Sequence, residues 1–394
     1  MFQRSHYHIL TKRIQEHRKH IQVIIGPRQV GKTTLLRQIL AKTDFPHTFI
    51  SADETGAGNL MWLENQWEAI RFKMKVEGIS SYLFVVDEIQ KVQQWSEIIK
   101  AQWDADTNSG LDIKLVILGS SRLLIQDGLT ESLAGRFETI HMGHWSFNEM
   151  HDAFGWTPEQ FVWFGGYPGS AELIHDEKRW KSYVRESLIE TCINKDILMM
   201  TRVDKPTLMR RLFEVGCLYS SQILSFNKIL GQLQDAKNTV TLSHYLKLLD
   251  TAGMICGLEK FSPNVIRQRS SSPRFQVHNT ALLSAQHRYD FQEIKDDPKE
   301  WGLILESSIG AHLLNYSFAS GYKVFYWRDG NDEVDFVIEK NGTAIGLEVK
   351  SNNGKNVNGM LAFKNKFNPE KILLIGESGI PWKEFIKIDP IQLF

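Results

Sequence analysis

Three short runs of apolar residues stand out in the first part of the chain: IQVII at 21–25, YLFVV at 82–86 and IKLVILG at 113–119. Runs of this kind are typical of strands that are buried on both faces of a parallel sheet. An amphipathic segment, TLLRQIL, follows the first run after a short loop. The pattern therefore predicts an α/β domain over residues 1–155, with helices on both faces of a parallel sheet.

Helical spacing of apolar residues prevails in the middle of the chain. Over 156–205 it predicts a helical linker or lid. Further helices are predicted at 207–219, 225–233 and 241–252, and the strand-like MICGLEKF follows them. Three helices and a strand in this order are typical of a winged-helix module, which we place at 206–274.

The third of these helices is the one that enters the major groove when a winged helix binds DNA. It would present Ser243, His244 and Lys247 to the bases. The loop that follows would either contact phosphates or lie in solvent. Its basic residues are Arg267, Arg269 and Arg274. Winged helices also serve as docking or lid modules, so contact with DNA and contact with protein both stay open.

The last part of the chain, 275–394, predicts a second α/β domain. A helix over 300–320 is followed by the strand VFYWRD. The next two strands, DEVDFVIEK and GTAIGLEVK, are separated by Asn341-Gly342, a dipeptide that favours a tight hairpin turn. We therefore expect a helix packed on a sheet that contains at least one hairpin.

The loop after the first strand, GPRQVGKT, fits the phosphate-binding pattern G-x-x-x-x-G-K-[ST]. Its glycines let backbone N–H groups approach a phosphate chain, and the helix N-terminus favours negative charge. Lys32 would reach the β- and γ-phosphates of ATP, and the Thr33 hydroxyl would ligate Mg²⁺. The predicted nucleotide-binding residues are Gly26, Pro27, Arg28, Gln29, Val30, Gly31, Lys32, Thr33 and Thr34.

The second apolar run ends in a Walker B pattern, in which Asp87 would hold Mg²⁺ and Glu88 would polarise the attacking water. The third run ends in Gly-Ser-Ser, where Ser120 or Ser121 would act as a sensor of the γ-phosphate or only turn the chain. Arg136 follows at a predicted turn. It is the candidate for an arginine finger, with a plain surface arginine as the alternative.

Four residues of the last domain form a candidate metal site. Asp335 lies within an otherwise apolar strand, where a charge needs a partner or a metal ion. Glu348 and Lys350 project from one face of the next strand. With the helical Glu306 they match the core of the PD-(D/E)XK, or restriction-endonuclease-like, fold, whose carboxylates bind Mg²⁺. Nuclease activity, binding of a metal or of branched nucleic acid without efficient cleavage, and a structural remnant all stay open.

With these motifs, the N-terminal part resembles the AAA-like ATPases of prokaryotic families that carry GPRQVGKTTLL, VVDEIQ and a G-S-S…S-L-A-G-R segment. GHWSFNEM and FGGYPGS are similar to the family's PLSFxE and GGxP segments. The resemblance implies a winged-helix module and then a domain related to PD-(D/E)XK nucleases. The chain departs from the family at Gly143-His144-Trp145, where Pro-Leu is usual, and at Asn279, where Asp is common.

Composition narrows the class of protein. With 394 residues, 42% of them hydrophobic, the chain is too long for one small domain and too apolar for a disordered tail. Its three cysteines show no metal-ligand spacing, and no run of 18 apolar residues occurs. We therefore expect a cytoplasmic protein with reduced thiols and no membrane span.

Charge is balanced overall but not along the chain. There are 46 Lys and Arg residues and 46 Asp and Glu residues. Residues 206–274 hold nine basic and four acidic residues, a net charge of +5, which leaves −5 for the rest. Because the positive segment coincides with the predicted winged helix, it favours a nucleic-acid partner.

Together these features predict an ATP-binding and ATP-hydrolysing oligomeric motor or switch that acts on DNA, with branched DNA in repair or recombination as one candidate substrate. Arg136 would be supplied across a subunit interface, so the active form would be a ring or another multimer. One alternative is a nucleotide-controlled protein-interaction or defence switch with an inactive nuclease-like domain. The other is an ATP-gated, metal-dependent nuclease.

Overall fold

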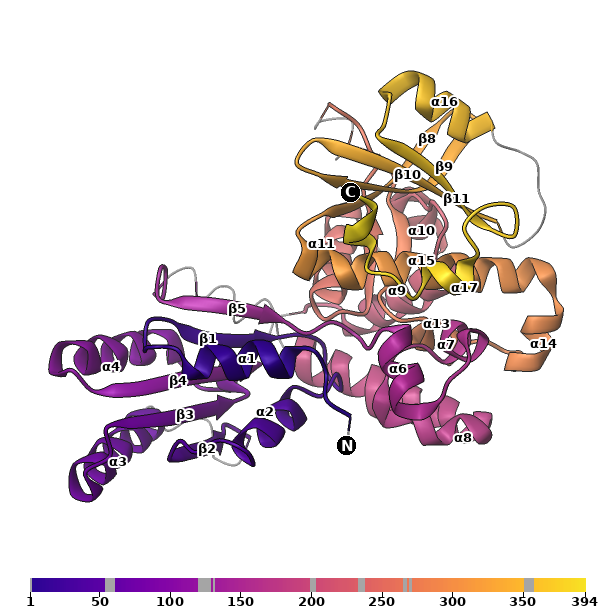
Figure 1. The fold of residues 1–394 in the computed structure, drawn as a ribbon. Coiled ribbons are helices and arrows are strands. Elements are labelled where there is room, and N and C mark those ends of the chain that lie inside the picture. Colours follow the sequence, from indigo (N-terminus) through magenta and orange to yellow (C-terminus); the bar gives the residue numbers. More distant parts are fainter. Residues whose placement is uncertain are drawn as a thin grey trace. The chain divides into compact units, whose positions relative to one another are not determined.

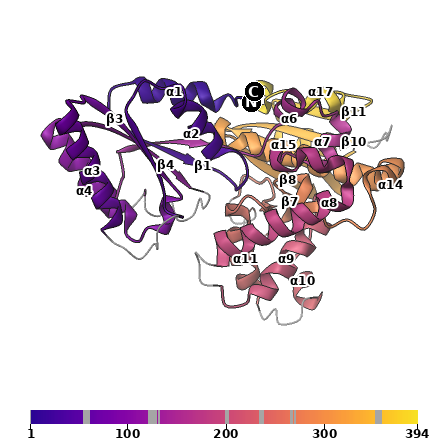
Figure 2. The same ribbon diagram turned by 90° about the horizontal axis from the view of Figure 1, so that it is seen from below.

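The structure is a computed structural model and describes residues 2–53, 61–119, 129, 132–198, 203–232, 238–264, 268, 271–350 and 358–394. The chain forms two compact units, Met1–Met142 and Gly143–Phe394. Figures 1 and 2 show both units, coloured along the sequence, from two directions. The first unit contains a five-stranded sheet, and the second contains a four-stranded and a two-stranded sheet.

The first unit is built on a five-stranded sheet. Its strands are β1 (Ile21–Ile25), β2 (His47–Ser51), β3 (Ser81–Asp87), β4 (Asp112–Gly119) and β5 (Phe137–His141). Their order is β2-β3-β4-β1-β5, and every neighbouring pair is parallel. The prediction of a parallel sheet is confirmed, and the three apolar runs at 21–25, 82–86 and 113–119 form β1, β3 and β4. Because β4 lies between β1 and β3, the loops after β1 and β3 flank the end of β4.

Helices cover both faces of this sheet, as Figure 2 shows. The covering helices are α1 (His6–Gln15), α2 (Lys32–Leu40), α3 (Trp62–Glu77) and α4 (Trp95–Ser109). Successive strand residues point to opposite faces. Val23 therefore packs with α3 and α4, and its neighbour Ile24 packs with α1 and α2. Two separate cores result, which explains why all five residues of β1 are buried.

The second unit begins with short helices. They are α6 (Phe147–Phe154), α7 (Pro158–Phe164), η2 (Pro168–His175) and α8 (Glu177–Ser182), followed by π-helical turns at Tyr183–Ile189 and Cys192–Leu198. A capping box starts α6: the Ser146 hydroxyl accepts from the Glu149 N–H (3.3 Å), and the Glu149 carboxylate accepts from the Ser146 N–H (2.9 Å). This reciprocal pair is the physical reason for the S-F-N-E sequence.

Three helices and a two-stranded sheet come next. They are α9 (Pro206–Leu218), α10 (Phe226–Gln232), α11 (Thr239–Thr251), β6 (Ile255–Leu258) and β7 (Arg274–Val277). The three helices lie within two residues of their predicted bounds. β6 and β7 pair in antiparallel fashion. The predicted limit between the winged-helix module and the C-terminal domain, at 274/275, falls inside β7.

The C-terminal sheet has the order β11-β10-β9-β8. Its strands are β8 (Lys323–Asp329), β9 (Asp332–Lys340), β10 (Thr343–Lys350) and β11 (Lys371–Gly376), and its helices are α13 (Thr280–Ser284), α14 (Phe291–Asp296), α15 (Pro298–Ser320), α16 (Asn358–Phe367), α17 (Trp382–Phe385) and η5 (Pro390–Leu393). The predicted helix over 300–320 is α15. The predicted hairpin joins β9 to β10, and positive φ angles at Asn341 (52°) and Gly342 (84°) fit its tight turn.

Asn279 has a structural role that its side-chain amide is suited to. It is buried, and its Oδ1 accepts hydrogen bonds from the N–H groups of Ala281 and Gly166, each at 3.1 Å. Its Nδ2 lies 3.1 Å from Nδ1 of His144, whose Nε2 lies 3.1 Å from the Gly253 carbonyl oxygen. The amide thus caps α13 and holds the Gly-Gly turn after α7. An aspartate there has no N–H to donate to the His144 ring.

Replacing Asn279 with alanine is expected to destabilise the second unit by about 3 kcal/mol, because it leaves buried polar groups without partners. The measurement is chemical denaturation of the full chain, with unfolding monitored by tryptophan fluorescence. Asn365→Ala, at an exposed position of α16, is the matched control and should change stability by less than about 0.5 kcal/mol. Equal effects of the two substitutions would contradict the assigned role.

Two further sequence expectations meet the structure here. Among the described residues, no helix combines the length and apolarity that crossing a bilayer requires. Cys192, Cys217 and Cys256 are all buried free thiols, as expected. Burial raises the pKa of Cys217 and of Cys256, which keeps both thiols protonated.

Candidate functional site

The predicted phosphate-binding loop, residues 26–31, joins the carboxyl end of β1 to the start of α2. Lys32 is the first residue of α2 and is buried. Its Nζ donates hydrogen bonds to the carbonyl oxygens of Gly26 (2.8 Å) and Pro27 (2.7 Å). The ammonium group therefore lies against the inside of the loop, where a phosphate chain would offer it oxygens in place of these carbonyls.

The two glycines of the loop are required for different reasons. A Cβ on Gly26 would lie 2.0 Å from the carbonyl oxygen of Met142, just after β5. Gly31 has open space around it but adopts φ +91°, which strains residues with a side chain. Position 26 thus needs glycine because another backbone comes close to it, and position 31 needs glycine because of its left-handed backbone conformation.

The other predicted loop residues differ in their environments. Val30 is buried in the core beneath α1 and α2, and its carbonyl oxygen accepts a hydrogen bond from Arg4 Nη1 at 3.1 Å. Pro27 and Arg28 are half-buried, whereas Gln29 is exposed with φ 63°. Thr34 is exposed on the first turn of α2. Arg4 supports the loop from behind, a contact 26 residues away in sequence that no local pattern indicates.

Thr33 and Asp87 meet at the carboxyl ends of the strands. The Thr33 hydroxyl donates a hydrogen bond to Asp87 Oδ2 at 2.8 Å, and the Glu88 N–H donates to Asp87 Oδ1 at 2.9 Å. Burial raises the pKa of Asp87, and the hydrogen bond from Thr33 only partly offsets this effect. A hydroxyl and a buried carboxylate side by side are hard oxygen donors of the kind that Mg²⁺ prefers, so both residues fit this ion.

Glu88 follows Asp87 in a left-handed conformation, with φ 51° and ψ 40°. Its carboxylate accepts a hydrogen bond from Gln90 Nε2. Such conformations are uncommon for residues with a side chain and often occur at functional sites. This turn directs the chain out of β3. Glu88 directly follows Asp87, and its N–H is bonded to the Asp87 carboxylate that also contacts Thr33. Ser120 and Ser121, the sensor candidates after β4, lie outside the described residues.

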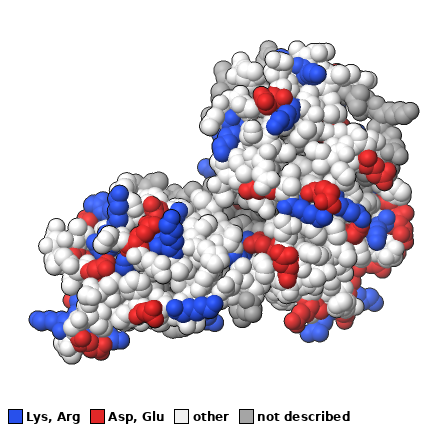
Figure 3. Space-filling view, viewed as in Figure 1, with Lys and Arg blue, Asp and Glu red and all other residues white. Residues whose placement is uncertain are grey.

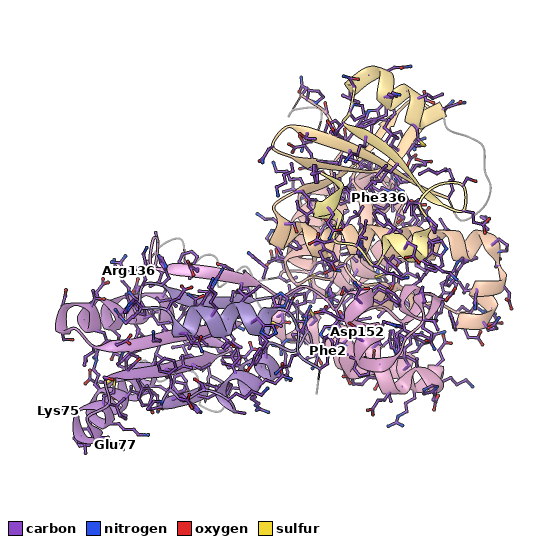
Figure 4. All side chains as sticks on the ribbon, viewed as in Figure 1. Phe2, Lys75, Glu77, Arg136, Asp152 and Phe336 are labelled. Carbon is purple, nitrogen blue, oxygen red and sulfur yellow. The ribbon has the colours of Figure 1, made fainter. Side chains whose placement is uncertain are left out.

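Arg136 lies near the amino ends of the strands, whereas the phosphate-binding loop lies at their carboxyl ends. Its carbonyl oxygen accepts a hydrogen bond from the N–H of Ile21, the first residue of β1, at 2.8 Å. With a rise of about 3.3 Å per residue, β1 places its amino end roughly 13 Å from its carboxyl end. Figure 4 labels Arg136 at the start of β5. Arg136 is therefore separated from the Lys32 of its own unit by the sheet.

The Arg136 guanidinium is already engaged. It donates two hydrogen bonds to the Asp104 carboxylate of α4, at 2.9 and 3.0 Å. This hydrogen bonding lowers the pKa of Asp104 below its usual value. Arg136 is about one-third exposed, so the pair lies at the surface of the unit. A finger role is open to Arg136 only toward the nucleotide site of another subunit.

A second group of charged residues lies in the second unit. Glu306 comes from the interior of α15, Asp335 from β9, and Glu348 and Lys350 from β10. Asp335 Oδ2 accepts a hydrogen bond from the Val349 N–H at 2.8 Å, and Lys350 Nζ lies 2.6 Å from Glu348 Oε1. The four predicted residues are thus brought to neighbouring strands and the helix that covers them.

Burial and the nearby charge of Asp335 raise the pKa of Glu348 to about 7, despite the hydrogen bond from Lys350. Burial alone would lower the pKa of Lys350, but the hydrogen bond and charge of Glu348 outweigh it and raise that pKa. Glu348 Oε2 is buried and has no hydrogen-bond partner among the described residues. A pocket of about 490 Å³ adjoins the group, and Glu306 and Val349 line it.

Sequence reasoning missed two members of this group. Arg274, predicted in an exposed loop, is instead the first residue of β7 and only 1% exposed. It pairs with Glu306, Asp335 and also Glu333. The signal was present in the alternation of RFQV, which is strand-like, but a basic residue after SSSP favoured a loop. Glu333 lies two residues before Asp335, on the same strand.

Two of the basic residues behind the sequence count of +5 for residues 206–274 are engaged by acidic side chains. Arg274 is buried, Arg210 is paired with Glu190, and Lys237, Arg267 and Arg269 lie outside the described residues. Figure 3 shows acidic and basic side chains intermixed on the face that it presents. Arg274 and Arg210 therefore add little to a basic surface on this module.

Comparison with known families divides the chain into three matched segments. A family described as an AAA domain matches residues 18–151. Two different domains of unknown function match residues 156–293 and 301–394. The first match covers β1 to β5 with the loop at 26–31 and the acidic pair Asp87-Glu88.

Similar curated proteins span most of the chain. Uncharacterized proteins of Mycobacterium tuberculosis and Mycobacterium bovis are each 27% identical over 350 residues, which is 85% of this chain and 71% of theirs. An uncharacterized protein of Methanocaldococcus jannaschii is 24% identical over 81% of this chain and 72% of its own length.

Among solved structures, the Thermotoga maritima RuvB Holliday junction branch migration motor is 15% identical, over 65% of this chain and 86% of its own, with a TM-score of 0.31. A likeness at this level is weak. The sheet order, the loop geometry and the family match together establish that the first unit has an AAA-type, P-loop ATPase-like fold.

Proposed function

We propose that the protein is an ATP-hydrolysing switch or motor that works as an oligomer and acts on DNA. The observation that carries the first part is the hydrogen bond between Thr33 and Asp87, next to Lys32 at the carboxyl edge of a parallel sheet. Residues 54 positions apart in sequence meet there with the hydroxyl, carboxylate and ammonium that ATP hydrolysis requires.

Each residue of this site has one task in the proposed reaction. Lys32 exchanges the carbonyls of Gly26 and Pro27 for oxygens of the β- and γ-phosphates. Thr33 and Asp87 would hold Mg²⁺, which neutralises charge on the phosphates. Glu88 accepts a proton from the attacking water, as a general base. All four of these residues belong to the first unit.

The action on DNA is assigned to α11. α11 packs against α9 and β6. Its residues Ser243, His244 and Lys247 are exposed. These three positions lie on one side of the helix, since residues three or four apart are neighbours. They offer a hydroxyl, an imidazole and an ammonium to a phosphate backbone or to base edges.

Lys247→Glu is therefore expected to weaken binding to duplex or branched DNA about tenfold, and to lower the slope of log affinity against log salt by about one. Binding is measured by fluorescence anisotropy at several salt concentrations. Lys178→Glu, at an exposed position of α8, is the matched control and should have little effect. Affinity that does not depend on salt, or equal losses in both variants, would argue against α11 as the DNA-binding element.

A second candidate is a nucleotide-controlled switch whose C-terminal domain does not cut DNA. The observation that favours it is the pairing of the Glu306 and Asp335 carboxylates with a side-chain cation of the protein. In this case ATP hydrolysis still depends on Lys32 and Glu88, but DNA neither binds in a salt-dependent way nor stimulates it. The salt titration above distinguishes the two candidates.

A further inference from the structure

The acidic group of the second unit is organised around Arg274. Its Nη1 donates to Glu333 Oε1 at 2.9 Å, and its Nη2 donates to Asp335 Oδ1 at 3.2 Å and to Glu306 Oε1. The guanidinium carbon also lies 5.2 Å from the centre of the Phe336 ring, which Figure 4 labels in the C-terminal sheet. One arginine thus connects α15 and two positions of β9.

Burial makes these contacts obligatory. The Arg274 side chain is 1% exposed, and a guanidinium is costly to remove from water unless carboxylates surround it. The Asp335 and Glu306 carboxylates are only 12% and 18% exposed, so they need a cation as much as Arg274 needs them. Removing either partner would leave a buried charge without its counter-charge.

A divalent cation between Glu306 and Asp335 would need the oxygens that Arg274 now uses. Mg²⁺ and Mn²⁺ bind carboxylate oxygens directly, and Mg²⁺ requires them at about 2.1 Å in octahedral geometry. Here Glu306 Oε1 and Asp335 Oδ1 both point to the same nitrogen, and Asp335 Oδ2 accepts from a backbone N–H. Glu348 keeps one buried oxygen, Oε2, without a partner among the described residues, but one carboxylate oxygen is too few for a six-coordinate ion. With Arg274 in place, the residues present therefore do not fit the metal that a PD-(D/E)XK site would hold.

We propose that Arg274 is a resident cation that takes the place of the divalent metal in this site, and that metal and guanidinium are alternative partners of the same carboxylates. The native site then supplies no metal-bound water for attack on a phosphodiester. Its carboxylates instead hold β7 against α15 and β9. The proposal concerns the second unit alone, so its failure would leave the proposed ATPase site untouched.

The test measures binding of Mn²⁺ to the nucleotide-free full chain, with electron paramagnetic resonance used to detect the ion that stays free. Wild type and Asp335→Asn are expected to bind Mn²⁺ equally. Arg274→Met, which keeps the bulk of the side chain but removes its charge, is expected to gain a site that binds at least tenfold more tightly. Adding Asp335→Asn to Arg274→Met should remove that site. Arg274→Lys, which keeps a cation there, should gain no site.

Thermal melting provides a second readout. Mn²⁺ is expected to raise the melting temperature of Arg274→Met but not that of wild type, because only a bound ion stabilises the folded state. The proposal is overturned if wild type binds one Mn²⁺ with an affinity that falls tenfold or more in Asp335→Asn. This comparison does not require Arg274→Met to fold. A folded Arg274→Met that gains no site overturns the proposal as well.

Discussion

Replacing Glu88 with glutamine is expected to lower the rate of ATP hydrolysis about 10²- to 10⁴-fold, the range that a general base contributes. The substitution keeps the shape of the side chain but removes the charge that would accept a proton from water. Lys32 and Thr33 are unchanged, so the affinity for ATP should change little. Turnover is measured as steady-state phosphate release, and affinity as equilibrium binding of a fluorescent ATP analogue.

Two comparisons make this expectation specific. Glu77→Gln changes an exposed glutamate at the end of α3, which leads into β3 and so lies at the edge of the sheet away from the loop. Figure 4 labels Glu77. This control should hydrolyse ATP at the wild-type rate, whereas Lys32→Ala should lose both binding and turnover. Wild-type turnover in Glu88→Gln would exclude Glu88 as the base, and a loss of ATP binding would show a structural role instead.

Replacing Arg136 with alanine is expected to lower ATP turnover about 10³-fold or more, the contribution of an arginine finger supplied in trans. Since Arg136 and Lys32 lie at opposite ends of the strands of one sheet, the loss should be repaired by a second subunit. Mixing Arg136→Ala with Lys32→Ala is therefore expected to restore turnover that neither variant has alone. The first supplies intact nucleotide sites, and the second supplies Arg136.

The ion pair with Asp104 provides the control for this experiment. If Arg136→Ala acts only by breaking that pair, Asp104→Asn should reduce turnover by the same factor. If Arg136 acts on a neighbouring subunit, Asp104→Asn frees the guanidinium and leaves most of the turnover in place. Absence of any recovery on mixing, with both variants folded and oligomeric, would show that Arg136 is a surface residue paired with Asp104.

The sequence allowed the first unit to be predicted in most respects, for physical reasons that act locally. The apolar runs at β1, β3 and β4 are continuous because these strands are buried on both faces. The glycine-lysine loop must follow a strand and start a helix, so its spacing carries its own context. The meeting of Thr33 with Asp87 then follows from the parallel arrangement, since the carboxyl ends of the strands share one edge.

Other features depend on contacts between residues far apart in sequence. Gly26 is required partly because Met142 approaches it, and Asn279 is required because it bonds to Gly166 and His144. A local pattern contains neither partner. Arg274 is the clearest case: charged residues are usually solvated, so its sequence context favours a loop, and only the fold shows three carboxylates around it.

The position of β7 has a consequence for how this protein can be dissected. β7 pairs with β6, and its first residue, Arg274, pairs with the carboxylates of α15 and β9. Just after β6, the Phe261 N–H donates to the carbonyl oxygen of Tyr326 in β8 at 2.7 Å. A fragment that starts after residue 274 would lose a strand partner and leave the Glu306 and Asp335 carboxylates without their cation. We therefore expect the two halves of the second unit to unfold as one cooperative block.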